Sequence, residues 1–152
     1  MKSGSGLSGN GENKLQDILR SMVAGIESSK SQLFDVYEAA RREVEEIRTQ
    51  LDNVREVTRS VIDEVDALTT EEQAEKQKLV HVSADYSEDA IRAAYEAVKN
   101  VQVRLGVAKE RERQLRRTRS RLETRLSHLQ KTLQGAERLA MRTDRGLSRL
   151  YL

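Results

Sequence analysis

The sequence predicts an all-α protein, a long antiparallel helical hairpin or coiled coil that dimerises into a partial four-helix bundle. The chain has 152 residues and no proline, with 34% charged and only 3% aromatic residues. This composition is typical of long helices and coiled coils. Apolar residues also recur at alternating spacings of three and four, the repeat of a helix that packs along one stripe. One strong break interrupts the repeat, near residue 85.

Residues 1–12 differ from the rest of the chain. They are rich in Gly, Ser and Asn, so we expect a disordered leader or an artificial tail, followed by a coiled-coil domain over residues 13–152. Gly6 and Gly11 have the spacing of a phosphate-binding loop, but Glu12 stands where that loop requires lysine. No nucleotide site is predicted here.

The first helix is expected over about residues 13–83. Ala40 and Val44 add a second four-residue step in succession, which predicts a stutter that locally relaxes the supercoil. The expected apolar seam is Leu15, Leu19, Met22, Ile26, Leu33, Val36, Ala40, Val44, Ile47, Leu51, Val54, Thr58, Val61, Val65 and Leu68, with Ser29 as a polar member.

A turn is expected at about residues 84–87, within "SADYSEDAIR". Ser87 followed by Glu88 and Asp89 is a good helix start, because a hydroxyl caps free N–H groups and acids favour the positive end of the helix dipole. Asp85 with Glu88 offers a rival capping box.

The second helix, about residues 88–150, carries the strongest repeat. Of its eighteen a and d positions, fifteen are apolar and the phase never slips. Nine continuous heptads predict a coiled coil. The a positions are Ile91, Val98, Leu105, Glu112, Arg119, Leu126, Leu133, Ala140 and Leu147, and the d positions are Ala94, Val101, Ala108, Leu115, Leu122, Leu129, Ala136, Thr143 and Leu150.

Opposite charges suggest how the helices pair. Residues 43–75 hold eleven acids and three basic residues, whereas residues 109–125 hold eight basic residues and three acids. If the turn centres on residue 85, residues 109–125 lie opposite about 45–61. We therefore expect the arginines to pair with the acidic arm and to set register, either within a hairpin or between chains.

The same fold-back places Glu112 opposite Thr58, with Arg119 one heptad further along. These three residues form a candidate polar core layer. Such a layer costs stability and fixes register, and it can also make the packing switchable. Both interpretations stay open.

Four apolar residues fall outside the main stripe and form a candidate dimer or secondary packing face: Val57, Ile62, Val103 and Val107. A lone hairpin of this length exposes much of its seam, so we expect a homodimer.

Few residues could support chemistry. The chain has no cysteine and only His81 and His128, and neither histidine has a metal-ligand spacing, so no metal, cofactor or catalytic site is predicted. The arginines of residues 109–125 lack interleaved aromatic residues for base stacking, which argues against a nucleic-acid site. No apolar run has the length of a membrane span.

Two stretches, "SQLFDVYEAARREVEEI" and "YSEDAIRAAYEAVKNVQVRLGVAKERERQLRRTRSRLETRLSHLQ", resemble the N-terminal sensor region of DegS-type histidine kinases of two-component systems. The resemblance spans about residues 15–140, whereas the closing "MRTDRGLSRLYL" matches poorly. It implies a cytoplasmic, homodimeric input domain, followed in cis by a kinase domain whose partner is a DegU-type response regulator.

The resemblance does not extend to catalysis. His128 is followed by Leu129 instead of an acid, so it is not the family's phosphoacceptor histidine. We expect this segment to have no enzymatic activity and to transmit a packing change along its C-terminal helix to the kinase domain. The alternative is a purely structural coiled-coil scaffold or spacer.

Overall fold

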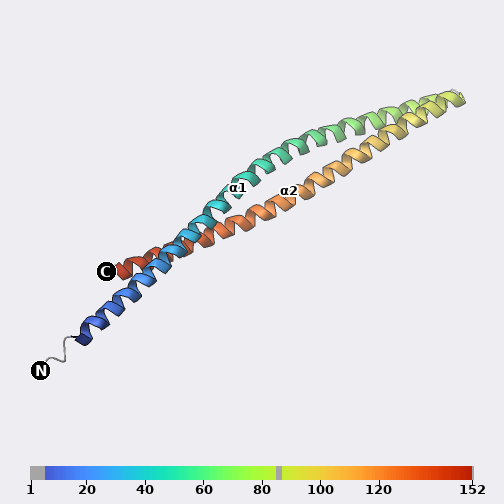
Figure 1. Ribbon diagram of the computed structural model, residues 1–152. Coiled ribbons are helices and arrows are strands. Elements are labelled where there is room, and N and C mark those ends of the chain that lie inside the picture. Colours follow the sequence, from blue (N-terminus) through green and yellow to red (C-terminus); the bar gives the residue numbers. More distant parts are fainter. Residues whose placement is uncertain (1–5, 85–86, 152) are drawn as a thin grey trace. The chain divides into compact units, whose positions relative to one another are not determined.

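The computed structural model describes residues 6–84 and 87–151, with side chains described for residues 11–84 and 87–146. It contains two helices, α1 (Gly6–Ser83) and α2 (Glu88–Tyr151) (Figure 1). Within these ranges there is no β-strand. The all-α, antiparallel helical hairpin predicted from the repeat is confirmed.

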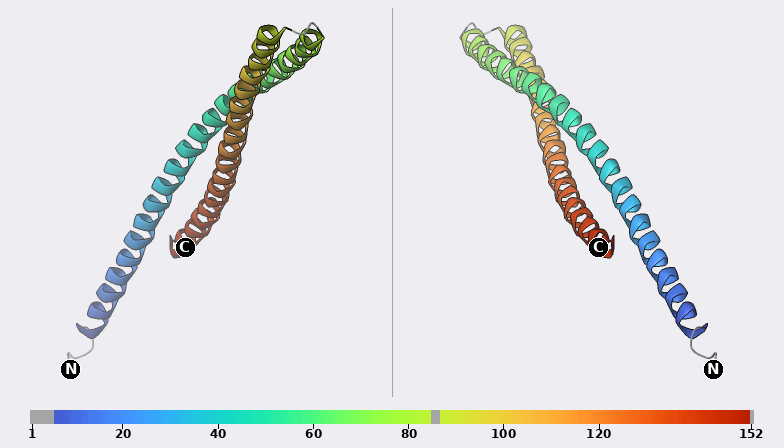
Figure 2. Two further views of the ribbon diagram at one scale, coloured as in Figure 1. Left: turned by 90° about the vertical axis from the view of Figure 1, so that its right-hand side faces the viewer. Right: turned by 90° about the vertical axis from the view of Figure 1, so that its left-hand side faces the viewer.

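The two helices pair in two compact units. The turn unit spans Ile47–Arg125 and contains the connection between the helices. The terminal unit pairs the part of α1 up to Glu46 with the part of α2 from Leu126 onward. In the turn unit, both views of Figure 2 show α1 and α2 leaving the connection and crossing each other.

Local hydrogen bonds define the helix ends at the connection. At the end of α1, the Ala84 N–H donates to the carbonyl of His81 (3.2 Å). At the start of α2, the Ala90 N–H donates to Ser87 Oγ (3.4 Å) and the Ile91 N–H to the Ser87 carbonyl (2.9 Å). Ser87 is therefore the N-cap, as predicted. Asp85, the rival cap, lies outside the described residues.

The start of α1 differs from the expected boundary. The helix begins at Gly6, so residues 6–12 are helical although the composition predicts a disordered leader over 1–12. Residues 11–20 are all exposed, so this part of α1 gains nothing from packing within the chain. A helix that is already nucleated extends at little cost, which accounts for the difference.

The core of the turn unit follows the predicted seam. Leu68, Leu105 and Ala108 form a buried cluster, with Val65 packed against it. Val61 is 2% exposed. Full burial of each such side chain contributes about 1.5–3 kcal/mol. The other buried seam residues of this unit are Ile47, Leu51, Val98 and Val101.

In the terminal unit the predicted stutter is absent. Met22 and Val36, assigned to the seam from the sequence, are exposed, whereas their neighbours Val23 and Tyr37 are half-buried. Between Val23 and Tyr37, one seam position is occupied by Lys30. Its Nζ contacts Asp144 Oδ1 on α2 (2.5 Å). With these residues included, the three-four alternation is uninterrupted. The buried and half-buried residues of the observed seam are Val23, Ile26, Leu33, Tyr37, Ala40 and Val44, and the exposed Lys30 stands at the remaining position.

The pairing register also differs from the predicted one. A turn centred on residue 85 would place Glu71 opposite residue 99, but Glu71 contacts Arg104 (3.2 Å). In the core cluster, Leu68 lies level with residues 105–108. Ten residues further from the connection along each helix, Thr58 therefore lies level with residues 115–118. Glu112 therefore lies about one helical turn from the level of Thr58. The simple fold-back failed because core packing, and not the midpoint of the connection, sets the register.

The core can be tested with two matched substitutions. Val61→Ala removes buried methyl groups and leaves a cavity, so it should lower the free energy of unfolding by about 2 kcal/mol. Val80→Ala, the same change at a 70% exposed site, should have little effect. Urea unfolding of both variants measures the difference, and equal effects would contradict the burial described above.

Gly106 offers a stabilising change. It lies inside α2, and no atom lies within 4 Å of the position that a Cβ would take. Gly106→Ala should therefore raise the free energy of unfolding by about 1 kcal/mol, because alanine has the higher helix propensity. Ala93→Gly, at an exposed site of the same helix, is the reverse control and should lower it by a similar amount.

Candidate functional site

The candidate polar layer consists of three side chains that are each satisfied within their own helix. Thr58 Oγ1 donates to the Val54 carbonyl (2.6 Å). Glu112 accepts a hydrogen bond from Arg116 Nη2 (2.6 Å), and Arg119 Nε donates to Glu123 (2.8 Å). Thr58 and Glu112 are half-buried, whereas Arg119 is exposed. The structure does not join the three residues into one hydrogen-bonded layer.

After Ala108, the part of α2 in the turn unit is less buried than the part before it. In the turn unit, no residue of α2 after Ala108 is buried, and the seam residues Leu115 and Leu122 are only half-buried. The side chain of Glu112 is 18% exposed. A carboxylate at a seam position keeps access to water, because full burial of an unpaired charge would cost several kcal/mol. The seam is thus weakest beside Arg119, where Val54, Leu115 and Leu122 are half-buried. It is not weakest at Glu112, since Val61, level with residues 112–115, is 2% exposed.

The arginine-rich segment differs from its predicted role. Three of its arginines pair with glutamates of α2 itself: Arg113 with Glu110 (3.3 Å), Arg116 with Glu112 (2.6 Å) and Arg119 with Glu123 (2.8 Å). For these three residues the expected pairing with the acidic arm is wrong. Neighbours three or four residues apart on one helix meet at little entropic cost, which favours pairing within the helix.

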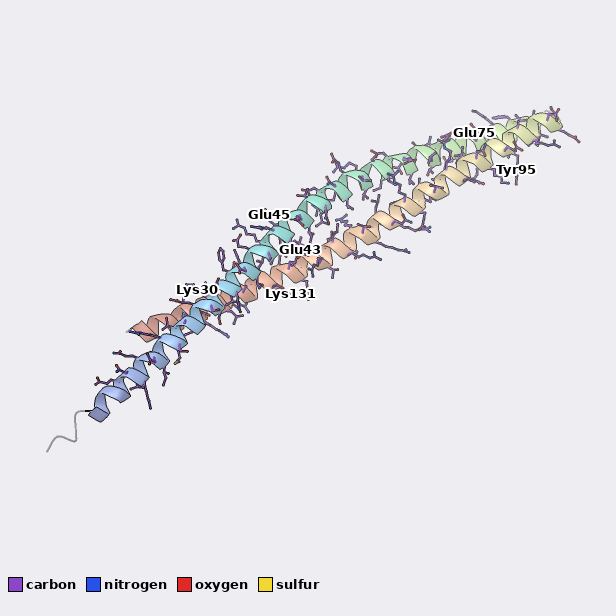
Figure 3. The ribbon with its side chains drawn as sticks, in the orientation of Figure 1. Lys30, Glu43, Glu45, Glu75, Tyr95 and Lys131 are labelled. Atoms are coloured by element: carbon purple, nitrogen blue, oxygen red, sulfur yellow. The ribbon has the colours of Figure 1, made fainter. Side chains whose placement is uncertain are left out.

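Ion pairs between the helices lie elsewhere. Arg104 pairs with Glu71 in the turn unit and Lys30 with Asp144 in the terminal unit. Figure 3 shows Lys30 where α1 lies beside α2. Neither pair was predicted from the sequence. Lys30, a cation at a seam position, was missed because the predicted seam followed Met22 and Val36 and so placed Lys30 outside it. All four side chains are largely exposed, so each pair contributes at most about 1 kcal/mol.

The candidate secondary packing face is exposed at all four positions. Val57 and Ile62 are five residues apart, which separates them by about 140° around α1. Val103 and Val107 are four apart and share one face of α2. Val103 points about 200° from the buried Leu105, away from α1. The two valines of α2 therefore form one row, and the residues of α1 flank the seam on opposite sides.

The terminal unit contains two grooves that were not predicted from the sequence. The larger, of about 700 Å³, is lined by Met22, Gly25, Ile26 and Ser29 of α1 and by Leu139, Arg142, Thr143 and Gly146 of α2. The smaller, of about 240 Å³, is lined by Lys30, Leu33, Phe34, Tyr37, Ala136, Glu137 and Ala140. Both are mainly apolar in character. The sequence feature that could have predicted the larger groove is a second row of apolar residues near Met22.

No metal-binding cluster of His, Asp or Glu occurs in the described ranges. Neither helix has, over those residues, an apolar stretch that is long enough to cross a membrane. The site features are thus features of helix packing, namely a loosened seam in the turn unit and open grooves in the terminal unit.

Comparison with known proteins places this helix pair in a family. The family model described as "Sensor protein DegS" matches residues 16–150. The chain is 33% identical over 128 residues to the signal transduction histidine-protein kinase/phosphatase DegS of Bacillus subtilis (strain 168), and 30% identical over 128 residues to DegS of Brevibacillus brevis.

Each alignment covers 82% of this chain and 33% of the relative, so the chain spans about a third of the length of these curated relatives. No solved structure matches it. The resemblance inferred from the sequence is therefore confirmed over nearly the whole helix pair. The chain belongs to the DegS sensor protein family.

Proposed function

We propose that this chain is the signal-input and dimerisation module of a cytoplasmic sensor histidine kinase similar to DegS. The observation that carries the proposal is the family match over residues 16–150, together with relatives that are named histidine-protein kinase/phosphatase and are about three times as long as the aligned segment. In this proposal the kinase domain follows α2 in cis. Catalysis, and contact with a DegU-type response regulator, belong to that domain.

The mechanism uses α2 as the transmitting element. α2 is one helix over 64 residues, so a rotation or shift at one point moves the residues that follow it. The half-buried stretch of the seam beside Arg119 is where such a movement costs least, since few buried contacts must be broken there. The segment itself needs no cofactor and contacts neither nucleic acid nor membrane.

The role of Glu112 and Arg119 can be tested by filling the seam. Glu112→Leu combined with Arg119→Leu should raise the unfolding midpoint of the isolated chain, because apolar residues at a positions pack against α1. In the full-length kinase, the rate of autophosphorylation should become insensitive to stimulus. A more stable double variant with an unchanged stimulus response would leave Thr58, Glu112 and Arg119 with a register role only.

A second prediction needs no knowledge of the stimulus. In the longer protein, two helix-forming residues inserted directly after Leu152 should rotate the kinase domain by about 200° relative to α2, whereas seven residues return it to nearly the same phase. Autophosphorylation should change strongly with two inserted residues and little with seven. Equal tolerance of both insertions would identify the segment as a spacer, the alternative function.

A further inference from the structure

α1 carries a second apolar row in the terminal unit, beside the seam that packs against α2. Leu15, Ile18 and Met22 are 62%, 55% and 50% exposed. They are spaced by three and four residues, and Gly25, Ser29, Gln32 and Val36 continue the row. This spacing is the heptad repeat, rotated by about 100° from the seam, because Met22 directly precedes Val23. A helix with two heptad faces is built to contact two neighbouring helices.

The second row forms one wall of the larger groove, and α2 supplies the other. Leu139 of α2, 49% exposed, faces this groove. Gly25 and Gly146 line it from opposite helices, and no atom lies within 4 Å of the Cβ position of either. The groove, of about 700 Å³, therefore has open space beside one glycine of each helix. Such space accepts the side chains of a further helix.

Charges beside the groove indicate which helix fits. On α2 the row next to the groove is basic: Lys131, Arg138 and Arg145, each seven residues apart. A copy related by a two-fold axis perpendicular to the helices would place this row against itself. A two-fold axis parallel to the helices instead lays α1 of one copy over α2 of the other, which separates the two basic rows.

The parallel axis also brings one pair of opposite charges together. Asp35 directly precedes Val36 of the second row, beyond the groove-lining residues of α1, and the contact between Lys30 and Asp144 fixes its level. Five residues further toward the connection, Asp35 is level with residue 139, next to Arg138. Neither Asp35 nor Arg138 forms an ion pair within its own chain in the described residues. Across the proposed two-fold axis, Asp35 of each copy would lie beside Arg138 of the other copy. The axis would therefore produce this contact twice in the dimer.

We propose that the larger groove of the terminal unit seats α1 of a second copy of this chain, in a parallel two-fold dimer with Asp35 of each copy beside Arg138 of the other. This inference rests on the proposed dimerisation and names its surface. It differs from the predicted face around Val103 and Val107, which lies in the turn unit. The groove is lined mainly by apolar and uncharged residues. Such a lining suits the apolar helix face of a second copy better than it suits a polyanion.

Charge reversal tests the arrangement directly. Asp35→Arg sets like charges at both contacts of its homodimer, and so does Arg138→Asp. Each variant should raise the dimer dissociation constant about tenfold, measured by sedimentation equilibrium at low salt. An equimolar mixture of the two variants should dimerise as well as the unchanged chain, because the mixed dimer restores opposite charges at both contacts. Asp17→Arg, an exposed reversal away from the groove, is the matched control.

Two results would contradict the proposed dimer interface at the larger groove. One is an unchanged dissociation constant for both single variants, and the other is a mixture that does not recover. Circular dichroism of each variant verifies that the helices remain. A pairing within one chain cannot explain recovery on mixing, since mixing restores charges only between chains.

An apolar comparison separates the two candidate faces. Leu139→Asp should dissociate the dimer, whereas Val107→Asp, at a 66% exposed site in the turn unit, should not. The opposite result would identify the Val103–Val107 row as the dimer interface and would contradict the proposed interface at the groove. A monomeric unchanged chain would overturn the groove together with the proposed dimerisation, while the insertion test of kinase coupling would stand independently.

Discussion

A narrow apolar stripe, buried between two antiparallel helices, is the interaction on which the rest of this structure depends. Each helix has only about two apolar residues per heptad to bury, and neither could be stable in water over this length from helix propensity alone. The stripe is well packed where Leu68, Leu105 and Ala108 form a buried cluster. Nearer the connection its residues Leu79, Val82 and Ile91 are only half-buried. Beside Arg119 the seam residues are only half-buried, and the proposed signalling role uses that looser packing.

Much of the fold could be predicted from the sequence because heptad spacing is a strong signal. The helices and the seam of α2 follow from it, whereas the cap at Ser87 follows from a hydroxyl that precedes two acids. The first part of α1 was harder, because two apolar rows run beside each other. Choosing Met22 and Val36 in place of Val23 and Tyr37 produced a stutter that does not exist. A lysine at a seam position, Lys30, concealed the true phase.

The candidate site was less predictable, because side-chain pairing depends on register and on local alternatives. Charge counting suggested that the arginines of residues 109–125 reach across to α1, yet three of them find glutamates on their own helix. A register error of about one turn was enough to separate Glu112 from Thr58. The groove around Gly25 and Gly146 depends on how two helices diverge in space, which a one-dimensional repeat does not contain.

α1 and α2 of one chain pair antiparallel in the register of the Glu71–Arg104 contact. The chain has no cysteine, so cysteine pairs can be introduced at positions 71 and 104, and at positions 71 and 99, and treated with a short thiol cross-linker. The structure predicts fast cross-linking within one chain for the first pair and slow cross-linking for the second. Faster reaction of the 71–99 pair, or products formed only between chains, would contradict this pairing.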